Sequence, residues 1–179
     1  KYLMENDNSK EQKLNCYLFS EIKNFIDEEK IKSIENEISQ EFKESIDIFI
    51  SKIKEGVNDS LICKMIRQDS IQEFVSYVSK TNLSLTSTIK ADFYESNSFL
   101  IENEPSLLEY AFFYGSTQVI KYLLNKHVEF TTKIWLYAIH SNNTEMINLL
   151  EENVIEENDI EIYKEGAIES IKCHHNEIA

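Results

Sequence analysis

One short stretch of the chain, Cys173-His174-His175, brings together three residues of the kinds that bind zinc. Successive residues of a helix point in different directions, whereas the ligands of a zinc ion converge on one point. The other two histidines, His127 and His140, are distant in the sequence and belong to other predicted repeats. The sequence therefore predicts no metal site and no cofactor.

Carboxylates are concentrated in one acidic stretch of the chain: Glu151, Glu152, Glu156, Glu157 and Asp159. Acid–base catalysis by paired carboxyl groups requires an enclosed pocket that separates their pKa values, and nothing in this stretch implies one. The sequence also lacks the GxSxG, GxGxxG, HExxH and Walker motifs. We therefore expect a protein that is not an enzyme.

The composition indicates a helical protein with no basic segment. Of the 179 residues, 42% are hydrophobic, which is enough for a core, while the 3 glycines and 1 proline are too few for the turns of a β-protein. The net charge of −14 disfavours binding to nucleic acid or to an anionic membrane. The 3 cysteines are widely spaced, which fits reduced thiols and predicts a cytoplasmic location.

The N-terminal region, residues 1–58, contains two series of apolar residues at helical spacing. The first begins near Lys10 and predicts one amphipathic helix, after a polar start at 1–9 that we expect to be frayed. The second runs from Ile31 to Ile53 and predicts either one long helix or two helices separated near Ser39. Gly56 and the residues that follow it then end this helical region.

A helix-turn-helix phrase recurs in the rest of the chain, at 65–74, 111–120, 138–147 and 170–179. The fifth residue of each copy is of a type that tolerates a positive φ angle: Asp69, Gly115, Asn142 and His174. The residues that follow include three good N-caps, namely Ser70, Ser116 and Asn143. This recurrence predicts a stacked array of helical repeats.

The array should contain paired helices at 60–67 and 70–79, 105–113 and 116–125, 132–140 and 143–151, and 160–172 with a last helix that starts at 175. Ser70 and Glu73 should form a capping box, and Pro105 should occupy the first turn of its helix. The alternative is an irregular bundle of amphipathic helices that resemble one another by chance.

The stretch SLLEYAFFYGSTQVIKYLLNKHVEF at 106–130 resembles an ankyrin repeat. The phrases SLICKMIRQDSIQEF, SLLEYAFFYGS, IWLYAIHSNNTEMINLLEEN and ESIKCHHNEIA are similar to a divergent ankyrin-like domain of unknown function that is expanded in parasitic protists. The resemblance implies an all-α fold, an ankyrin-like helix-turn-helix repeat solenoid at 59–179 with an N-terminal helical cap at 1–58. Glu109 stands where the family has a histidine, so the hydrogen bonds that this motif makes between repeats should be missing or replaced.

In ankyrin repeats, partner contacts come from the connecting fingers and from the exposed end of each first helix. By position, the resemblance implies these partner-binding residues: Arg67, Gln68, Phe113, Tyr114, His140, Ser141 and Lys172. Phe113 and Tyr114 are either an aromatic anchor for the partner or they pack against a neighbouring repeat or the segment 81–104.

That segment, 81–104, is inserted between the first two repeats and carries Phe93, Tyr94, Phe99 and Leu100. These four side chains are exposed if the insert is a binding finger, and buried over the first two repeats if it is a structural cover. We expect a cover, because four large apolar groups are rarely left in water.

Together these features predict a protein–protein interaction module that binds an unidentified protein partner as a monomer, without catalysis. The alternative is a structural, self-associating protein in which the N-terminal helices at 10–55 form an intermolecular coiled coil.

Overall fold

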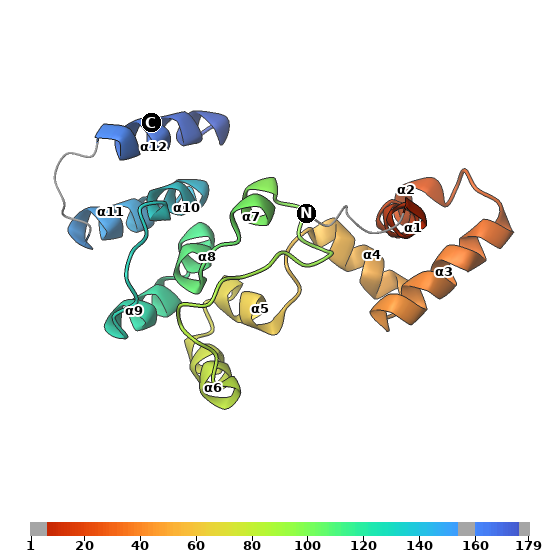
Figure 1. Cartoon of the computed structure of the whole chain (residues 1–179), viewed down its shortest axis with the longest axis horizontal. Coiled ribbons are helices and arrows are strands. Elements are labelled where there is room, and N and C mark those ends of the chain that lie inside the picture. Colours follow the sequence, from red (N-terminus) through yellow and green to blue (C-terminus); the bar gives the residue numbers. More distant parts are fainter. Residues whose placement is uncertain (1–6, 154–159, 176–179) are drawn as a thin grey trace. The chain divides into compact units, whose positions relative to one another are not determined.

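The computed structural model describes residues 7–153 and 160–175, which contain only helices and no strand (Figure 1). The helices are α1 (Asp7–Tyr17), α2 (Phe19–Ile22), α3 (Glu28–Phe42), α4 (Ile46–Glu55), α5 (Leu61–Arg67), α6 (Ile71–Thr81), α7 (Ser98–Asn103), α8 (Leu107–Tyr114), α9 (Thr117–Asn125), α10 (Ile134–His140), α11 (Thr144–Asn153) and α12 (Ile160–Lys172). The prediction of an all-α fold is confirmed for this part of the chain. The last helix, which was expected to start at residue 175, lies outside the described residues, as do residues 1–6.

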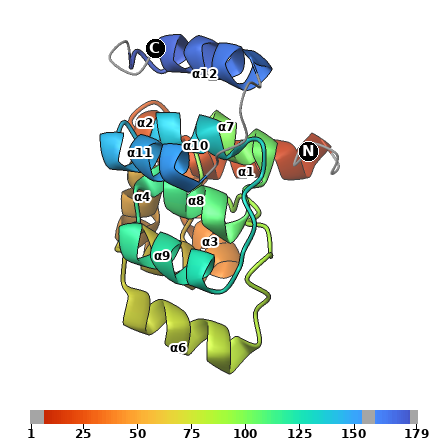
Figure 2. The ribbon, with the colours of Figure 1, turned by 90° about the vertical axis from the view of Figure 1, so that its left-hand side faces the viewer.

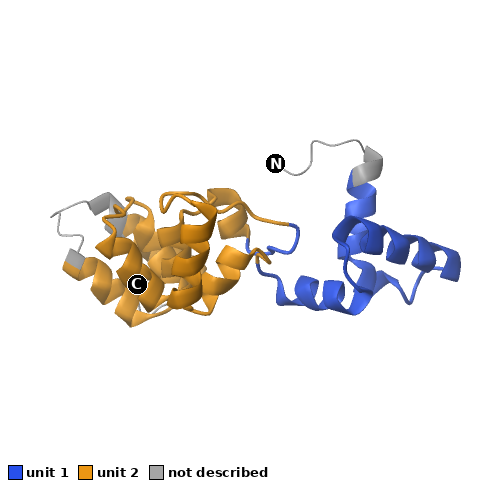
Figure 3. Cartoon of the chain, turned by 90° about the horizontal axis from the view of Figure 1, so that it is seen from below, with its two compact units in different colours: residues 1–57, 93–97 blue, residues 58–92, 98–179 orange. Residues whose placement is uncertain are grey.

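The chain forms two compact units, which Figure 3 shows in blue and orange. The N-terminal unit consists of residues 1–57 and 93–97, and the C-terminal unit of residues 58–92 and 98–179. The segment 81–104, expected to be a single insert of the repeat region, is therefore shared between the two units. None of the helices in the described ranges is long and apolar enough to cross a bilayer.

The helices of the N-terminal unit are shorter than the sequence predicted. The first amphipathic series is divided at Leu18 into α1 and α2, and residues 7–9, expected to be frayed, belong to α1. The second series forms two helices, but the break lies at Lys43 rather than near Ser39. Lys43 ends α3 with a φ angle of 54°, and this left-handed conformation cannot continue a helix.

An aromatic cluster forms much of the core of the N-terminal unit. Phe42 and Phe93 lie with their ring centroids 4.8 Å apart, as do Phe42 and Phe49, and Tyr94 is only 6% exposed beside them. The Tyr94 hydroxyl donates a 2.5 Å hydrogen bond to Glu44, and Glu44 also pairs with Lys52. The segment 93–97 is thus an integral part of this core.

The C-terminal unit is built from helical hairpins with matching turns. Asp69, Gly115 and Asn142 lie at the bends of α5–α6, α8–α9 and α10–α11 with φ angles of 49°, 66° and 49°, and His174 follows α12 with a φ angle of 59°. Each of these residues donates its backbone N–H to the carbonyl three positions earlier. The predicted position and left-handed conformation of all four turn residues are confirmed.

The first helices of the hairpins pack on one another in chain order: α5 on α8, α8 on α10, and α10 on α12 (Figure 1). On the side of the second helices, α6 packs on α9, and Figure 2 shows α6 and α9 at one end of the unit and α12 at the other. Buried apolar residues of α5, α6, α8, α9, α10 and α11 form one continuous core, which includes Ala111, Ile120, Leu123, Ala138 and Met146. The hairpins α5–α6, α8–α9 and α10–α11 therefore share one core.

The predicted capping of the second helices is wrong for two of the three hairpins. Ser70 and Ser116 have ψ angles of 72° and 76° rather than extended ones, so neither hydroxyl caps its own helix, and Ser70 and Glu73 form no capping box. Ser116 Oγ instead donates a 2.6 Å hydrogen bond to the carbonyl of Ile66 in the preceding hairpin. Only Asn143 caps as expected, since its Oδ1 accepts from the N–H of Glu145.

A capping box occurs at the start of α8, where Ser106 is the N-cap and Glu109 the third helical residue. Pro105 therefore precedes the cap and does not lie in the first turn. Glu109 also accepts a 2.5 Å hydrogen bond from Thr131, which leads into the next hairpin. Glu109 therefore links the start of α8 to the segment that precedes α10.

None of the four large apolar side chains expected to form a cover is exposed, since Tyr94 and Leu100 are buried and Phe93 and Phe99 are half-buried, but they do not lie in one place. Phe93 and Tyr94 contribute to the N-terminal core, whereas Leu100, only 2% exposed, and Phe99 pack in the C-terminal unit. The four side chains therefore do not cover the first two repeats together, because the segment crosses from one unit to the other between them.

Candidate protein-contact surface

The ends of the four first helices lie in a row, because each of these helices packs on the next. The row carries the residues predicted to bind a partner, and we call them the contact row: Arg67, Gln68, Phe113, Tyr114, His140, Ser141 and Lys172. The structure brings these residues together from helices spread over about a hundred positions of the sequence. It also shows how much of each side chain is already engaged within the unit.

Arg67 connects the first two hairpins. Its Nη1 donates to the carbonyl of Asn58 at 2.6 Å and to the hydroxyl of Tyr110 at 3.0 Å, and its guanidinium lies 5.8 Å from the ring centre of Tyr114. Burial raises the pKa of Tyr110 well above its usual range, so the hydroxyl stays protonated and neutral. Arg67 is therefore held in place by the fold, and the adjacent Gln68 is the exposed residue at this end of the row.

The middle of the row is a stack of aromatic rings. Phe99 of α7 lies on the ring of His140, with centroids 4.1 Å apart, and Phe113 lies 5.3 Å from the same ring. Phe113 thus packs against the segment 81–104 and the next hairpin, as the alternative interpretation predicted. Phe113 and Tyr114 nevertheless remain half-buried, so part of each ring is accessible.

The far end of the row is more polar. Ser141 Oγ donates to the carbonyl of Ala138 at 2.6 Å and accepts from the N–H of Asn143, which closes the third turn. Lys172 pairs with Glu169 at 2.9 Å, while its side chain stays 65% exposed. Gln68 and Lys172 are thus the two exposed ends of the contact row, with half-buried residues between them.

A second feature, missed by the sequence analysis, is the cluster of His140, Glu169 and Cys173. His140 Nε2 lies 2.9 Å from Glu169 Oε1, and Cys173 Sγ lies 3.4 Å from His140 Nδ1 and 3.6 Å from its Nε2. The expectation that His140 and Cys173 are far apart, because they belong to different repeats, is wrong. The two residues meet because α12 packs directly on α10.

The ionisation of this cluster follows from its partial burial. Burial lowers the pKa of His140, and the hydrogen bond that its ring donates to Glu169 opposes this shift. Burial acts to raise the pKa of Glu169, but the hydrogen bonds from Lys172 and His140 outweigh it, so the pKa of this carboxyl lies below its usual value. At neutral pH the cluster is therefore a neutral imidazole between a carboxylate and a thiol whose pKa burial raises.

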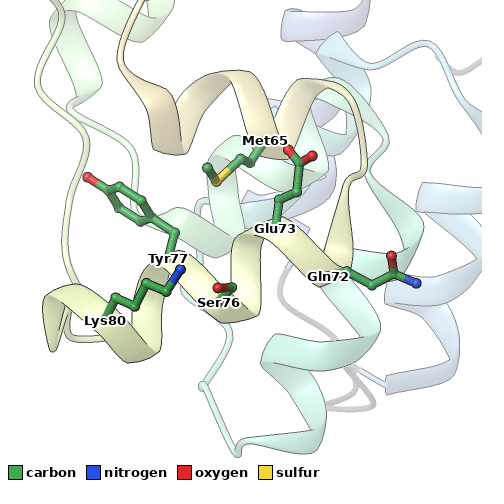
Figure 4. A pocket seen from close by; sticks show the side chains of 6 residues that line it. All are labelled: Met65, Gln72, Glu73, Ser76, Tyr77 and Lys80. Carbon is green, nitrogen blue, oxygen red and sulfur yellow. The ribbon is translucent and has the colours of Figure 1, made fainter.

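A shallow groove of about 390 Å³ lies along the outer side of the first hairpin (Figure 4). Its lining consists of one residue of α5 and five of α6: Met65, Gln72, Glu73, Ser76, Tyr77 and Lys80. These α6 residues recur every three or four positions and alternate with the buried Phe74 and Val78, a signal that the sequence already contained. All the polar members are exposed or half-buried, so the groove is open to solvent.

The chain matches no protein-family model, no curated protein and no solved structure. The resemblance to ankyrin repeats is therefore supported only by the sequence phrases in which it was found.

Proposed function

We propose that the protein is a protein–protein interaction module, an ankyrin-like repeat solenoid that binds a protein partner along the contact row and performs no catalysis. The observation that carries this proposal is the row of first helices with one turn geometry repeated at Asp69, Gly115, Asn142 and His174. Hairpins that repeat in this way present the ends of their first helices at regular intervals on a rigid support. The N-terminal helices, as a cap of this array, remain part of the proposal.

The half-buried aromatic residues of the row are suited to partner binding. Phe113 and Tyr114 are held by their own packing, with ring centroids 5.0 Å apart in an edge-to-face arrangement. Side chains that are already ordered lose little conformational entropy when a partner covers their accessible part. A partner would therefore gain binding energy chiefly in the middle of the row, with Gln68 and Lys172 at its edges.

The charge of the chain favours a partner with a basic surface. The net charge is −14, and complementary charge accelerates association more than it increases affinity. Binding should therefore weaken as the salt concentration rises.

Affinity capture from an extract of the source cells, with a matched pair of surface variants, tests the proposal. The row variant combines Gln68→Ala with Tyr114→Ala, and the control variant combines Gln118→Ala with Lys121→Ala on the exposed side of α9. We expect one protein to be retained by the wild type and the control, and to bind the row variant at least ~10-fold more weakly. Equal retention by all three chains would contradict the assignment of the row.

The alternative, a self-associating structural protein, is favoured by apolar residues left exposed in the N-terminal unit. Phe25 is 87% exposed and Leu14 is 56% exposed, although Ile34, Ile38 and Phe49, from the series expected to form the coiled coil, are buried within the unit. Light scattering at micromolar concentration distinguishes the two proposals. A monomer supports the interaction module, whereas a dimer that Phe25→Ser converts to a monomer supports self-association.

A further inference from the structure

The cluster of His140, Glu169 and Cys173 combines three kinds of donor atom, a nitrogen, an oxygen and a sulfur, that all lie within 4.8 Å of one another. We propose that these three residues form a binding site for a zinc ion, which links α10 to α12 at the end of the helical row. The site does not depend on the proposed partner-binding function.

The spacing of the donors is close to that of a tetrahedral site. Zinc–nitrogen, zinc–oxygen and zinc–sulfur bonds place the nitrogen about 3.3 Å from the oxygen and about 3.6 Å from the sulfur. In the structure, Nε2 of His140 lies 2.9 Å from Oε1 of Glu169 and 3.6 Å from Sγ of Cys173. Side-chain adjustments on the order of an ångström therefore suffice to place all three donors around one ion.

The backbone that presents these donors is in place. Glu169 and Cys173 are four residues apart and thus lie on the same face of α12. Gly166 lies on that face too, where an added Cβ would come within 3.2 Å of the side chain of Ile139 in α10. The absence of a side chain at Gly166 therefore leaves room for Ile139 where α12 lies against α10.

The imidazole is also oriented in advance. The ring of His140 is stacked at 4.1 Å on Phe99 and at 5.3 Å on Phe113, with interplanar angles of 29° and 25°. A half-turn of the ring about its Cβ–Cγ bond keeps this plane, and with it both stacks. The ring can therefore present either nitrogen to the ion without losing its packing.

The donor set favours zinc over magnesium or calcium. A thiolate and an imidazole are ligands for zinc, whereas magnesium and calcium require oxygen ligands. Three protein ligands leave a fourth position for water. His140 ends α10 and Glu169 lies in the last turns of α12, so both helices direct the negative end of their dipole toward the cation.

Two other groups face the site and affect its charge. Lys172 binds the second oxygen of Glu169, Oε2, at 2.9 Å, which leaves Oε1 directed at His140. His175 lies in the turn after α12, and its backbone N–H bonds to the carbonyl of Ser170. Because the side chain of Lys172 is 65% exposed, it can turn into solvent when a divalent cation arrives.

Titration of the metal-free chain with zinc chloride in a calorimeter, together with cobalt(II) as a spectroscopic probe, tests the proposal. We expect one equivalent of zinc to bind with a dissociation constant on the order of micromolar or lower. Cobalt should produce the visible bands of a tetrahedral site and a thiolate-to-metal charge-transfer band. Zinc should also protect Cys173 from alkylation in the folded chain, where Cys16 and Cys63 are buried.

The variants Cys173→Ser and Glu169→Gln preserve shape and should each weaken zinc binding by at least ~10-fold, and Cys173→Ser should remove the charge-transfer band. The control is His127→Asn, which replaces an exposed histidine at a positive φ angle with another residue that tolerates this conformation. This control should bind zinc like the wild type. If the wild type binds no zinc, or if Cys173→Ser binds it as tightly as the wild type, the proposal is wrong.

Discussion

The two units of the chain build their cores in different ways. In the N-terminal unit, Phe42 and Phe49 meet Phe93 and Tyr94, which come from a segment more than forty positions later in the sequence. In the C-terminal unit, the buried apolar residues come from hairpins that follow one another in the chain, and α5 packs on α8, α8 on α10 and α10 on α12. The first core depends on one returning segment, whereas the second depends on a local pattern that recurs.

This difference affects what the sequence reveals. A recurrent pattern of short-range contacts can be recognised along the chain, whereas a core that needs a distant segment cannot. We also expect that damage to one core leaves the stability of the other core unchanged. Three sets of variants test this expectation.

The largest effect is expected from Phe49→Ala, which empties a position that is fully buried in the aromatic cluster. We expect the free energy of unfolding of the N-terminal unit to fall by about 3–5 kcal/mol. Trp135 is the only tryptophan and belongs to the C-terminal unit, so its fluorescence reports on that unit alone. Denaturant titration should show an earlier transition by circular dichroism and an unchanged transition by fluorescence.

Two further variants control this experiment. Ile48→Ala, next to Phe49 but 51% exposed, should change neither transition by more than ~1 kcal/mol. Leu123→Ala, at a fully buried position of the C-terminal core, should lower the stability reported by Trp135 by about 2–5 kcal/mol. If Phe49→Ala shifts the fluorescence transition as strongly as the circular dichroism signal, the two cores are not independent.

An intermediate effect is expected from Asp69→Ala, which removes a contact between consecutive hairpins. The carboxylate of Asp69 accepts hydrogen bonds of 3.0 Å from the backbone N–H groups of Gln118 and Val119 in the first turn of α9. Its φ angle of 49° is also unfavourable for alanine. The free energy of unfolding reported by Trp135 should fall by about 1–3 kcal/mol.

Asp69→Asn isolates the contribution of the negative charge, because asparagine tolerates the same φ angle and keeps one acceptor oxygen. This variant should lose less stability than Asp69→Ala. Equal losses in both variants would mean that the charge of the carboxylate, and not its geometry, stabilises the start of α9.

The smallest effect concerns the pH dependence of the N-terminal core. Burial raises the pKa of the Cys16 thiol from 9.0 to about 11, with Glu37 and Glu41 adding to the shift. The unfolded chain therefore ionises this thiol first, and the stability that the neutral thiol contributes is complete below pH 9 and is lost as the pH rises toward 11.

Circular dichroism of the wild type and of Cys16→Ala, compared between pH 8 and pH 10, measures this contribution. Between pH 8 and pH 10, the wild type should lose about 1 kcal/mol of stability relative to Cys16→Ala. A difference that does not vary with pH would show that Cys16 is accessible to hydroxide in the folded N-terminal unit.

The sequence was most informative where structure depends on neighbouring residues. The four turn residues were predicted from residue type and spacing, since a positive φ angle is tolerated by only a few residue types. The break in the second N-terminal series was misplaced, because Lys43 adopts the left-handed conformation without being such a type. The capping hydrogen bonds expected from Ser70 and Ser116 are also absent, because the ψ angles of 72° and 76° at these residues are not extended.

The candidate sites show more clearly that contacts between distant segments cannot be inferred from local sequence patterns. Position in the sequence identified the ends of the first helices, but the extent to which Phe113 and Arg67 are engaged follows from Phe99 and Tyr110, which other helices supply. The sequence analysis set His140 aside because it belongs to another predicted repeat than Cys173, 33 residues away. Proximity between such residues is a property of helix packing and leaves no mark on the local pattern.

The sequence by itself thus determined an all-α chain, the approximate helices and the turns that join them, because helix formation and turn geometry depend on residues within a few positions of one another. Tertiary structure alone decided that residues 93–97 complete the N-terminal core and that α12 lies on α10. It also decided which side chains of the contact row stay accessible. These outcomes depend on the close packing of side chains from distant segments, which no local pattern of residues records.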